Sequence, residues 1–169
     1  MANILSYSKM QEIKKCSQNN KDFLEQMIKE TEFSDFKKMV GRDVYAAILA
    51  EIQSGITEEL QAILNGGLYQ CIAYLTYANY IQQSNAIDTS TGLRQKVISD
   101  SEVVKLGQIK NIAVYNKDIA TEYYLSVKDQ LTSHFGICGD SVRTDNFSEI
   151  IGVRRKSDGN QPKTEIVIL

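Results

Sequence analysis

The chain has 169 residues, enough for one domain with a buried hydrophobic core. Its formal net charge is −2 and its charged residues are interspersed, which excludes both the basic surface of a typical nucleic-acid-binding protein and an acidic tail. The three cysteines, Cys16, Cys71 and Cys138, are scattered, which favours free thiols in a reducing compartment, and no apolar run predicts a signal peptide or a membrane span.

The first third of the chain predicts helices. Residues 6–16 predict a short amphipathic helix, and Asn20 is a suitable N-cap for the helix that follows, because its side chain can accept from free first-turn amides. That second helix should end at Gly41, since glycine suits the left-handed position that closes a helix. A further helix should begin at residue 42. The apolar positions of these helices are Met10, Ile13, Phe23, Leu24, Met27, Ile28, Phe36, Val40, Val44, Ala47, Ile48 and Ile52.

The next segment predicts one long helix over residues 58–82. Thr57 is its N-cap, and acidic residues in its first turn favour the positive end of the helix dipole. Gly66 and Gly67 weaken it by about 1 kcal/mol each relative to alanine. The alternative is two helices broken at Asn65. Its apolar stripe consists of Leu60, Ile63, Leu64, Leu68, Cys71, Ile72 and Leu75.

Residues 86–98 do not continue the helical pattern. Leu93, Gln95 and Val97 alternate with Arg94, Lys96 and Ile98, which predicts an extended strap that lies outside the helical body. Ser99 and Glu102 then form a capping box at the start of a second long helix, which should run to about His134. The apolar stripe of this helix is Val103, Leu106, Ile109, Ala113, Ala120, Tyr124, Val127 and Leu131.

The last part of the chain predicts a C-terminal arm. Residues 135–169 are rich in glycine, serine, aspartate and asparagine, and they contain two β-prone patches that could form a hairpin turning at Asp158 and Gly159. Such a hairpin would be marginal by itself. The predicted fold class is therefore mainly α: a bundle of about four to five helices in residues 1–134, with an extended strap between the two long helices and an extended or β-hairpin arm in residues 135–169.

Few residues indicate catalysis or metal binding. Cys138 lies four residues after His134, the only histidine, so a cysteine–histidine nucleophile pair is conceivable, but such neighbours also arise by chance. Three cysteines and one histidine at these separations lack zinc-ligand spacing, and we expect no cofactor. Glu30, Glu32 and Asp35 are interpreted as the solvated face of a helix.

Tyrosines gather on the two long helices and allow three interpretations. They are Tyr69, Tyr74, Tyr77 and Tyr80 on the first and Tyr115, Tyr123 and Tyr124 on the second. They could stack on bases, but no lysine or arginine lies between Tyr45 and Ser90 to neutralise phosphates. They could instead be half-buried residues that pack the two helices together, or they could form a subunit interface, where tyrosine is enriched.

The strap and the arm are the predicted interaction surfaces. A connection between antiparallel helices needs only a few residues, so a longer β-prone strap suggests another role. Backbone groups on an extended segment can pair with a strand of another chain. The candidate subunit or partner interface consists of Thr89, Thr91, Gly92, Leu93, Val97, Ile98, Ile150, Ile151, Val153, Ile166, Val167, Ile168 and Leu169.

The order of these segments resembles the head–tail connector proteins of tailed double-stranded DNA bacteriophages. In such proteins a helix commonly ends in an L-G-x-x-x-Y-x-x-L pattern, which is matched here by Val40, Gly41, Tyr45 and Ile48 (or Leu49). A T-x-x-G pattern between two long helices is also typical, and Thr89 and Gly92 match it. The similarity covers residues 23–133.

The resemblance implies a structural protein of the virion neck with no catalytic activity. Such proteins form a homo-oligomeric ring, of about twelve copies, beneath the portal. The ring binds the portal protein and a further neck or tail protein, and DNA crosses it only as cargo during genome ejection. Assembly would take place in the host cytoplasm, with no membrane involved. The rival hypotheses are a cytoplasmic helical protein-binding module whose tail is ordered by a partner, and a small enzyme built around Cys138 and His134.

Overall fold

The protein is mainly helical, as the sequence predicts. The computed structural model describes residues 3–16, 21–84, 86–89, 92–95 and 106–136. Helices account for most of these residues, and two short strands form the only sheet among them. The predicted C-terminal arm lies outside the described residues, apart from its first two positions at the end of the last helix.

The first described helices follow the predicted boundaries closely. They are α1 (Tyr7–Ile13), α2 (Lys21–Thr31), a π-helical turn at Glu32–Phe36, α3 (Lys37–Val40) and α4 (Arg42–Ser54). Gly41 ends α3 with φ at 92°, a left-handed value that favours glycine. The Ser6 hydroxyl caps α1 by accepting from the Lys9 amide at 3.2 Å. The predicted Asn20 cap lies outside the described residues.

The predicted long helix is continuous in extent but not regular. It consists of α5 (Glu58–Ile63), a π-helical turn at Leu64–Leu68 and α6 (Tyr69–Gln83). Thr57 caps it as predicted, because its hydroxyl accepts from the Leu60 amide at 3.2 Å. Within the π-helical turn, Gly67 has non-helical angles of φ 173° and ψ −24°. Neither one uniform helix nor two helices separated at Asn65 describes this path, since the chain bends while the helical hydrogen bonding continues.

The predicted strap begins as a β-hairpin. Strand β1 (Ala86–Thr89) pairs antiparallel with β2 (Gly92–Gln95), and Thr89 faces Gly92 at the turn. The last helix, α7 (Leu106–Phe135), ends within one residue of the predicted boundary. Val97, Ile98 and the predicted capping box at Ser99 and Glu102 lie outside the described residues.

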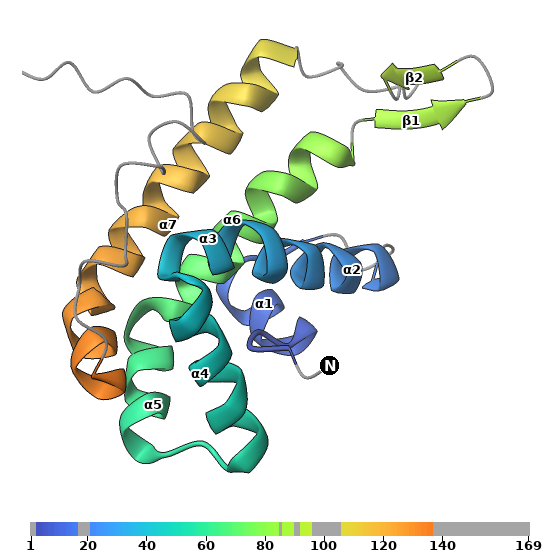
Figure 1. Ribbon diagram of the computed structural model, residues 1–169. Coiled ribbons are helices and arrows are strands. Elements are labelled where there is room, and N and C mark those ends of the chain that lie inside the picture. The colour runs from blue at the N-terminus through green and yellow to red at the C-terminus, as the bar shows by residue number, and fades with distance from the viewer. Residues whose placement is uncertain (1–2, 17–20, 85, 90–91, 96–105, 137–169) are drawn as a thin grey trace, which may run out of the picture.

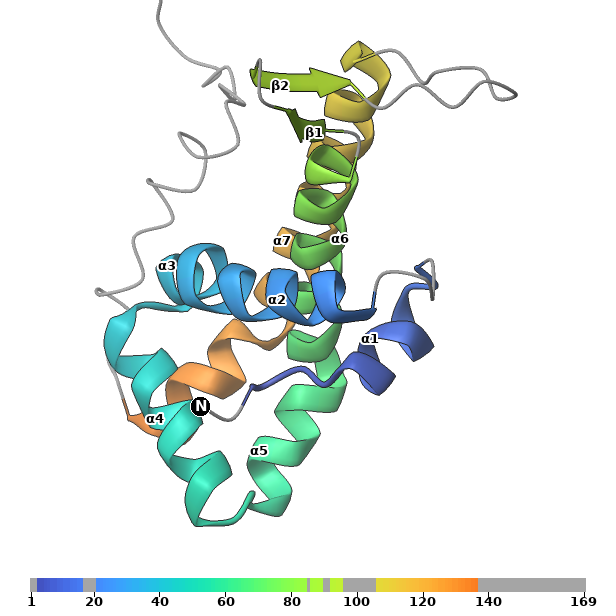
Figure 2. The same ribbon diagram turned by 90° about the vertical axis from the view of Figure 1, so that its right-hand side faces the viewer.

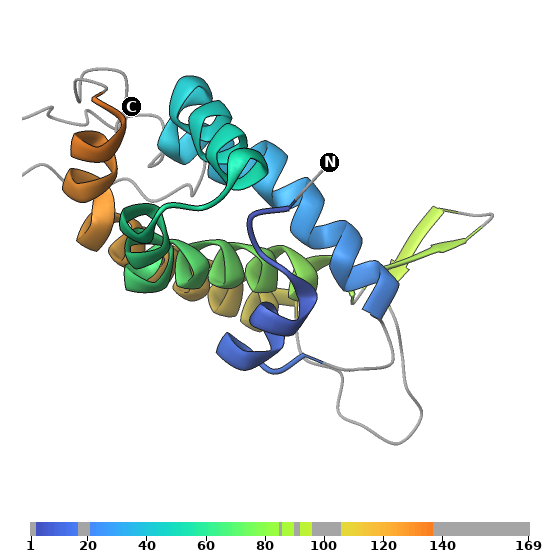
Figure 3. The ribbon, with the colours of Figure 1, turned by 90° about the horizontal axis from the view of Figure 1, so that it is seen from below.

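Helix α6 is the centre of the molecule. Figure 1 shows α7 running alongside α6, with the β1–β2 hairpin beyond one end of the pair and the α4–α5 corner at the other. Figure 2 shows α1 and α2 on the side of α6 away from α7, with α2 running across it. The view from below in Figure 3 shows the hairpin projecting clear of the helices. The arrangement confirms a helical body with an extended connection outside it.

The hydrophobic core is built from the predicted stripes. Every predicted stripe residue of α5, the following π-helical turn and α6 is buried. On α7, the stripe is buried at Ile109, Ala113, Ala120, Tyr124, Val127 and Leu131. Residues from α2, α3 and α4 complete the core, among them Leu24, Phe36 and Ile48, which have no exposed surface. Burial of this apolar surface is the main favourable contribution to folding.

A close backbone approach explains Gly67. A Cβ atom at this position would lie 2.7 Å from the carbonyl oxygen of Tyr123 and 3.0 Å from Cγ1 of Val127. The first of these atoms belongs to the backbone and cannot rotate away. Any side chain at residue 67 would therefore push α7 away from the kinked helix, by which we mean α5, the π-helical turn and α6 together. At Gly66 the nearest atom, Val127 Cγ1, would lie at an ordinary 3.4 Å. The two adjacent glycines therefore have different roles, and only Gly67 is required by packing.

We expect Gly67→Ala to lower the free energy of unfolding by roughly 1–3 kcal/mol, since overpacking forces backbone shifts of this order of cost. Gly66→Ala is the matched control and should be neutral or slightly stabilising, because it replaces glycine by a better helix former without a clash. Urea denaturation of both variants measures the difference. Equal effects of the two substitutions would contradict the packing role of Gly67.

Candidate functional site

The predicted interface residues fall into two groups. Thr89, Gly92 and Leu93 belong to the β1–β2 hairpin. The remaining predicted positions lie outside the described residues: Thr91, Val97, Ile98, Ile150, Ile151, Val153, Ile166, Val167, Ile168 and Leu169. The structure therefore locates one of the two predicted surfaces, at the end of the α6–α7 pair that is distant from the α4–α5 corner (Figure 1).

The two ends of the T-x-x-G pattern, Thr89 and Gly92, lie opposite each other in this hairpin. Thr89 and Gly92 are the last facing pair, and Asp88 faces Leu93 next to them. The two strands pair with each other, and within the described ranges neither outer edge pairs with a further strand. The backbone groups along such an edge can form hydrogen bonds with a strand from another chain. The hairpin therefore has the geometry required for strand addition.

The L-G-x-x-x-Y-x-x-L pattern forms the corner between α3 and α4. Val40 and Ile48 have no exposed surface, and Gly41 provides the left-handed turn. The ring of Tyr45 meets that of Phe36 edge-on, with 6.3 Å between their centres. This pattern is therefore structural: it holds α4 against the remainder of the helical body.

His134 ties the end of α7 to the α4–α5 corner. Its Nε2 atom lies 2.8 Å from Oε2 of Glu51, and its Nδ1 atom lies 3.3 Å from Oε2 of Glu59. The imidazole side chain is only 12% exposed. Both nitrogens carry protons only in the charged form, so both contacts are satisfied together when His134 is protonated. The interaction fixes the position of the end of α7, where the predicted C-terminal arm begins.

The charges at this junction shift the pKa values of two groups. The hydrogen bond to Glu51 outweighs desolvation and raises the pKa of His134 above its ordinary 6.5. Burial opposes ionisation of Glu51, but hydrogen bonds from Thr57 and His134 outweigh it and hold that pKa below its ordinary 4.5. The histidine stabilises the fold fully below pH 6.5 and loses this contribution as pH rises through its raised pKa. The glutamate contributes above pH 4.5 and loses its contribution as pH falls. The junction is therefore strongest in mildly acidic solution.

A buried carboxylate holds the first residues of the chain, and the sequence did not predict it. Oε2 of Glu32 accepts from the Ile4 amide at 3.1 Å, and Oε1 accepts from the Leu5 amide at 2.8 Å. Glu32 is 2% exposed, so its interpretation as part of a solvated face is wrong. Burial raises the pKa of Glu32 to about 7, although the two amide hydrogen bonds favour the ionised form and oppose that shift.

The three acidic side chains of this region have different environments because they lie on different faces of α2 and of the π-helical turn that follows it. Glu30 is exposed and accepts from Gln26 at 2.7 Å, as expected of a solvated face. Asp35 is half-buried and accepts from Asn79 of α6 at 2.8 Å. At about 3.6 residues per turn, Glu30 and Glu32 point to nearly opposite sides of a helix. The sequence did contain a signal, because Glu32 follows the buried Leu24 and Ile28 at intervals of four residues, which places it on the same face as these apolar residues.

Lysines of the first segment cover the tyrosines of α6. We call residues 3–16 the docked segment. Nζ of Lys14 lies 4.8 Å from the ring centre of Tyr74 and 4.6 Å from that of Tyr77. Nζ of Lys9 lies 5.9 Å from the ring centre of Tyr69. Each such cation–π contact contributes about 0.5–1 kcal/mol where it is partly exposed. No lysine or arginine lies near these tyrosines in the sequence, but lysines from the first residues of the chain lie over their rings in the folded protein.

The remaining tyrosines favour the packing interpretation. Tyr124 is buried, and the ring of Tyr123 stacks on that of Tyr74 at 5.7 Å between centres, which joins α7 to α6. Tyr80 is 9% exposed and packs against Phe23 of α2. Tyr115 differs, because it is 65% exposed on α7. The α6 tyrosines therefore connect the docked segment, α2 and α7, which leaves little ring surface for stacking on bases.

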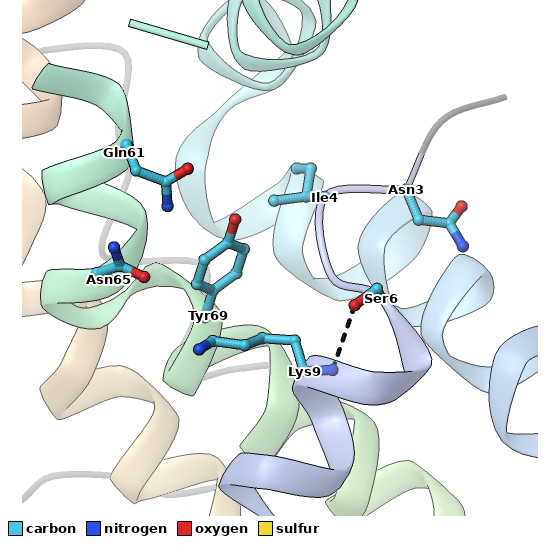
Figure 4. Close-up of a pocket in the computed structure, with 7 residues that line it drawn as sticks. All are labelled: Asn3, Ile4, Ser6, Lys9, Gln61, Asn65 and Tyr69. Carbon is cyan, nitrogen blue, oxygen red and sulfur yellow. Dashed lines mark hydrogen bonds between the residues drawn. The ribbon is translucent and has the colours of Figure 1, made fainter. Parts of the chain in front are cut away.

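A polar pocket lies between the docked segment and the kinked helix. Its volume is about 300 Å³, and Figure 4 shows Gln61, Asn65 and Tyr69 on one side with Ile4, Ser6 and Lys9 opposite. Lys9 is paired with Glu12 at 2.9 Å. The pocket shows that the docked segment does not fill the whole surface that it covers.

The described residues contain neither a metal-binding cluster nor a membrane-spanning helix. No cluster of three or more histidine, cysteine, aspartate or glutamate side chains in that part of the chain could hold a metal ion. Of the helices described, none has the length and apolar character needed to cross a membrane. Cys138 of the conceivable nucleophile pair lies outside the described residues, and its neighbour in sequence, His134, is engaged by two carboxylates.

Comparison with known proteins identifies a family. The model of a family of unknown function (DUF6712) matches residues 24–135, so the chain belongs to that family. The matched region begins within α2 and ends with α7, so it contains the hairpin and excludes the docked segment. No curated protein and no solved structure matched the chain.

The raised pKa of Glu32 predicts a pH dependence of stability. The folded state holds this proton more tightly than the unfolded state, so the free energy of unfolding should fall as pH rises from about 4.5 to about 7. A shift of this size corresponds to about 3 kcal/mol. Glu32→Gln should remove this fall, whereas Glu30→Gln, at the exposed glutamate two residues earlier, should retain it.

Urea denaturation of the three proteins between pH 4 and pH 8 tests this prediction. The difference between variants in the pH dependence of the free energy of unfolding reports on Glu32, because the distant His134 titrates in all three proteins. A Glu32→Gln protein with the same pH dependence as the unaltered chain would contradict the assignment.

Proposed function

We propose that this member of the DUF6712 family is a structural protein of the bacteriophage neck. In this proposal it forms a ring that joins the portal to the tail and continues the DNA channel. It acts without catalysis and without a cofactor. Its partners are further copies of itself, the portal protein and a second neck or tail protein, and it is located in the virion after assembly in the host cytoplasm.

The observation that carries this proposal is the hairpin beyond the end of the α6–α7 pair. Two long packed helices form a rigid support, and they hold β1 and β2 clear of the body (Figure 3). A surface hairpin of only two strands is marginally stable by itself. Its position and its open edges are understandable if another chain pairs with it. A rigid body with a projecting strand pair suits a component that is repeated around a ring.

Both patterns of the resemblance have a structural role in this chain. The glycine of the first pattern, Gly41, forms the α3–α4 corner, and the ends of the second pattern, Thr89 and Gly92, form the last facing pair of the hairpin. Their roles support the view that the resemblance reflects a common architecture rather than chance matches. The family match covers the region that contains both.

The contacts of His134 support the proposal that residues 135–169 form an arm that binds a neighbouring subunit or the portal. The arm predicted for residues 135–169 begins immediately after α7, and two glutamates fix the end of that helix. A fixed origin limits the volume that an attached arm can reach, which raises its effective concentration near a neighbouring subunit. In our proposal the arm adds β-prone residues to a sheet edge of the portal or of the adjacent copy.

The hairpin surface can be tested by substitution. We expect Leu93→Ser, Val97→Ser and Ile98→Ser together to leave helicity unchanged but to abolish ring formation on portals. Each apolar side chain would contribute about 1.5–3 kcal/mol if fully buried at the contact. A matched control replaces three exposed apolar residues of the body, Ile56, Ile112 and Leu125, by serine.

Circular dichroism and negative-stain electron microscopy with purified portals measure the two effects. The control should assemble normally. Rings formed equally well by both triple variants would show that the connection has no role in assembly.

The arm is tested by truncation. Deletion of residues 166–169 should leave the protein folded and soluble, because these residues follow the helical body, yet it should prevent attachment to the portal or to the neighbouring ring. Hydrogen exchange of residues 137–169 should be fast in the free protein and slow after assembly, since ordering such a segment requires a sizeable partner surface. Strong protection in the free monomer would refute the arm.

A further inference from the structure

We infer that the docked segment, residues 3–16, is an exchangeable element that can occupy the same surface on a second copy of this chain. We call that surface the docking surface and define it by Glu32, Tyr69, Tyr74 and Tyr77. The inference goes beyond the proposed ring. It uses that proposal only in assuming that copies of the chain lie side by side.

The docking surface recognises the segment mainly through its backbone and its apolar side chains. The Glu32 carboxylate accepts from two consecutive amides, those of Ile4 and Leu5, because the chain bends at these residues and directs both donors to one carboxylate. Ile4 and Leu5 are themselves buried at 5% and 0% exposure, and Met10 of α1 has no exposed surface. The surface therefore has the properties of a peptide-binding site: a fixed acceptor for main-chain donors and contacts for apolar side chains.

Charge complementarity reinforces this recognition along α1. The α6 tyrosines present ring faces, and the segment supplies the ammonium groups that lie over them, with Lys14 contacting both Tyr74 and Tyr77. The free thiol of Cys16 ends the described part of the segment. Main-chain donors, apolar anchors and cations thus all come from one contiguous stretch of chain, so the complete set can move together.

A docking surface without a bound segment has a higher free energy than an occupied one. Removing the segment would expose the apolar surface beneath Leu5 and Met10 and the faces of three tyrosines. It would also remove both hydrogen bonds of the Glu32 carboxylate that the structure shows. Exchange with a neighbour avoids this cost, because the same contacts form whether the segment comes from the same chain or from another copy.

The boundary of the family supports a separable segment. The matched region begins at residue 24, so the family is defined by the helical body without the docked segment. Only residues 17–20 connect the described part of the segment to α2. A fixed neighbour raises the effective concentration of its segment, which favours exchange in an assembly over exchange in dilute solution.

Two full-length variants test the inference by complementation. Leu5→Asp places a carboxylate against Glu32 and should release the segment while leaving the docking surface intact. Glu32→Ala removes the acceptor and should leave an intact segment without its docking surface. We expect the amides of Ile4 and Leu5 in the Glu32→Ala chain to exchange rapidly when that protein is alone.

The two variants are then mixed at high concentration, with the Glu32→Ala chain isotopically labelled, and exchange is read by mass spectrometry of its first peptide. Its segment should dock on the Leu5→Asp copy, so exchange of the two amides should slow by at least about tenfold. Mixing with unlabelled Glu32→Ala protein is the matched control and should give no protection. Identical fast exchange in both mixtures would overturn the inference, as would protection in Glu32→Ala protein alone.

Circular dichroism checks that each variant retains the helical body. If Glu32→Ala loses helicity, Glu32→Gln replaces it, because glutamine keeps the shape of the side chain but only one acceptor oxygen. The measurement contains no portal, so failure to bind a portal would leave this result unaffected. Failure of the exchange would likewise leave the ring proposal in place.

Discussion

The close contact between α7 and the kinked helix at Gly67 is the constraint on which the rest of the structure depends. Because this residue has no Cβ atom, the backbone of the π-helical turn can approach the Tyr123 carbonyl, and α6 and α7 pack along their lengths. Their pairing buries the two apolar stripes and supports the hairpin at one end. At the other end it brings His134 to Glu51 and Glu59. The hairpin and the end of α7, from which an arm is predicted to begin, thus lie at opposite ends of one packed helix pair.

Glu32 has a comparable role for the first part of the chain. A carboxylate at 2% exposure with no cationic partner among its hydrogen-bond contacts is costly, and two main-chain amides offset that cost. The same group raises the pKa of Tyr45, although burial of that tyrosine is the larger cause. The corner that carries the first pattern of the resemblance and the surface that holds the docked segment are therefore linked electrostatically. A change at Glu32 would affect both.

The sequence predicted those features that local rules control. Gly41 and Thr57 were identified because a left-handed residue and an N-cap have recognisable chemistry, and the stripes of α6 and α7 were identified by their period. The roles of Gly67 and Glu32 were missed because they depend on which distant atoms approach them. The strap was predicted to be extended, but its hairpin register could not be predicted, since Thr89 and Gly92 do not form a strong turn signal. Lys14 and the α6 tyrosines meet only through tertiary contacts.

A projecting hairpin, the arm predicted to follow α7 and the proposed exchangeable first segment would each connect copies of this chain into an assembly. The most direct test is electron cryomicroscopy of the unaltered protein mixed with purified bacteriophage portal rings. The account predicts a closed ring of copies coaxial with the portal, with the β1–β2 hairpins in contacts between subunits or with the next ring. Portals that remain bare at saturating protein, or that bind copies without closing a ring, would contradict it.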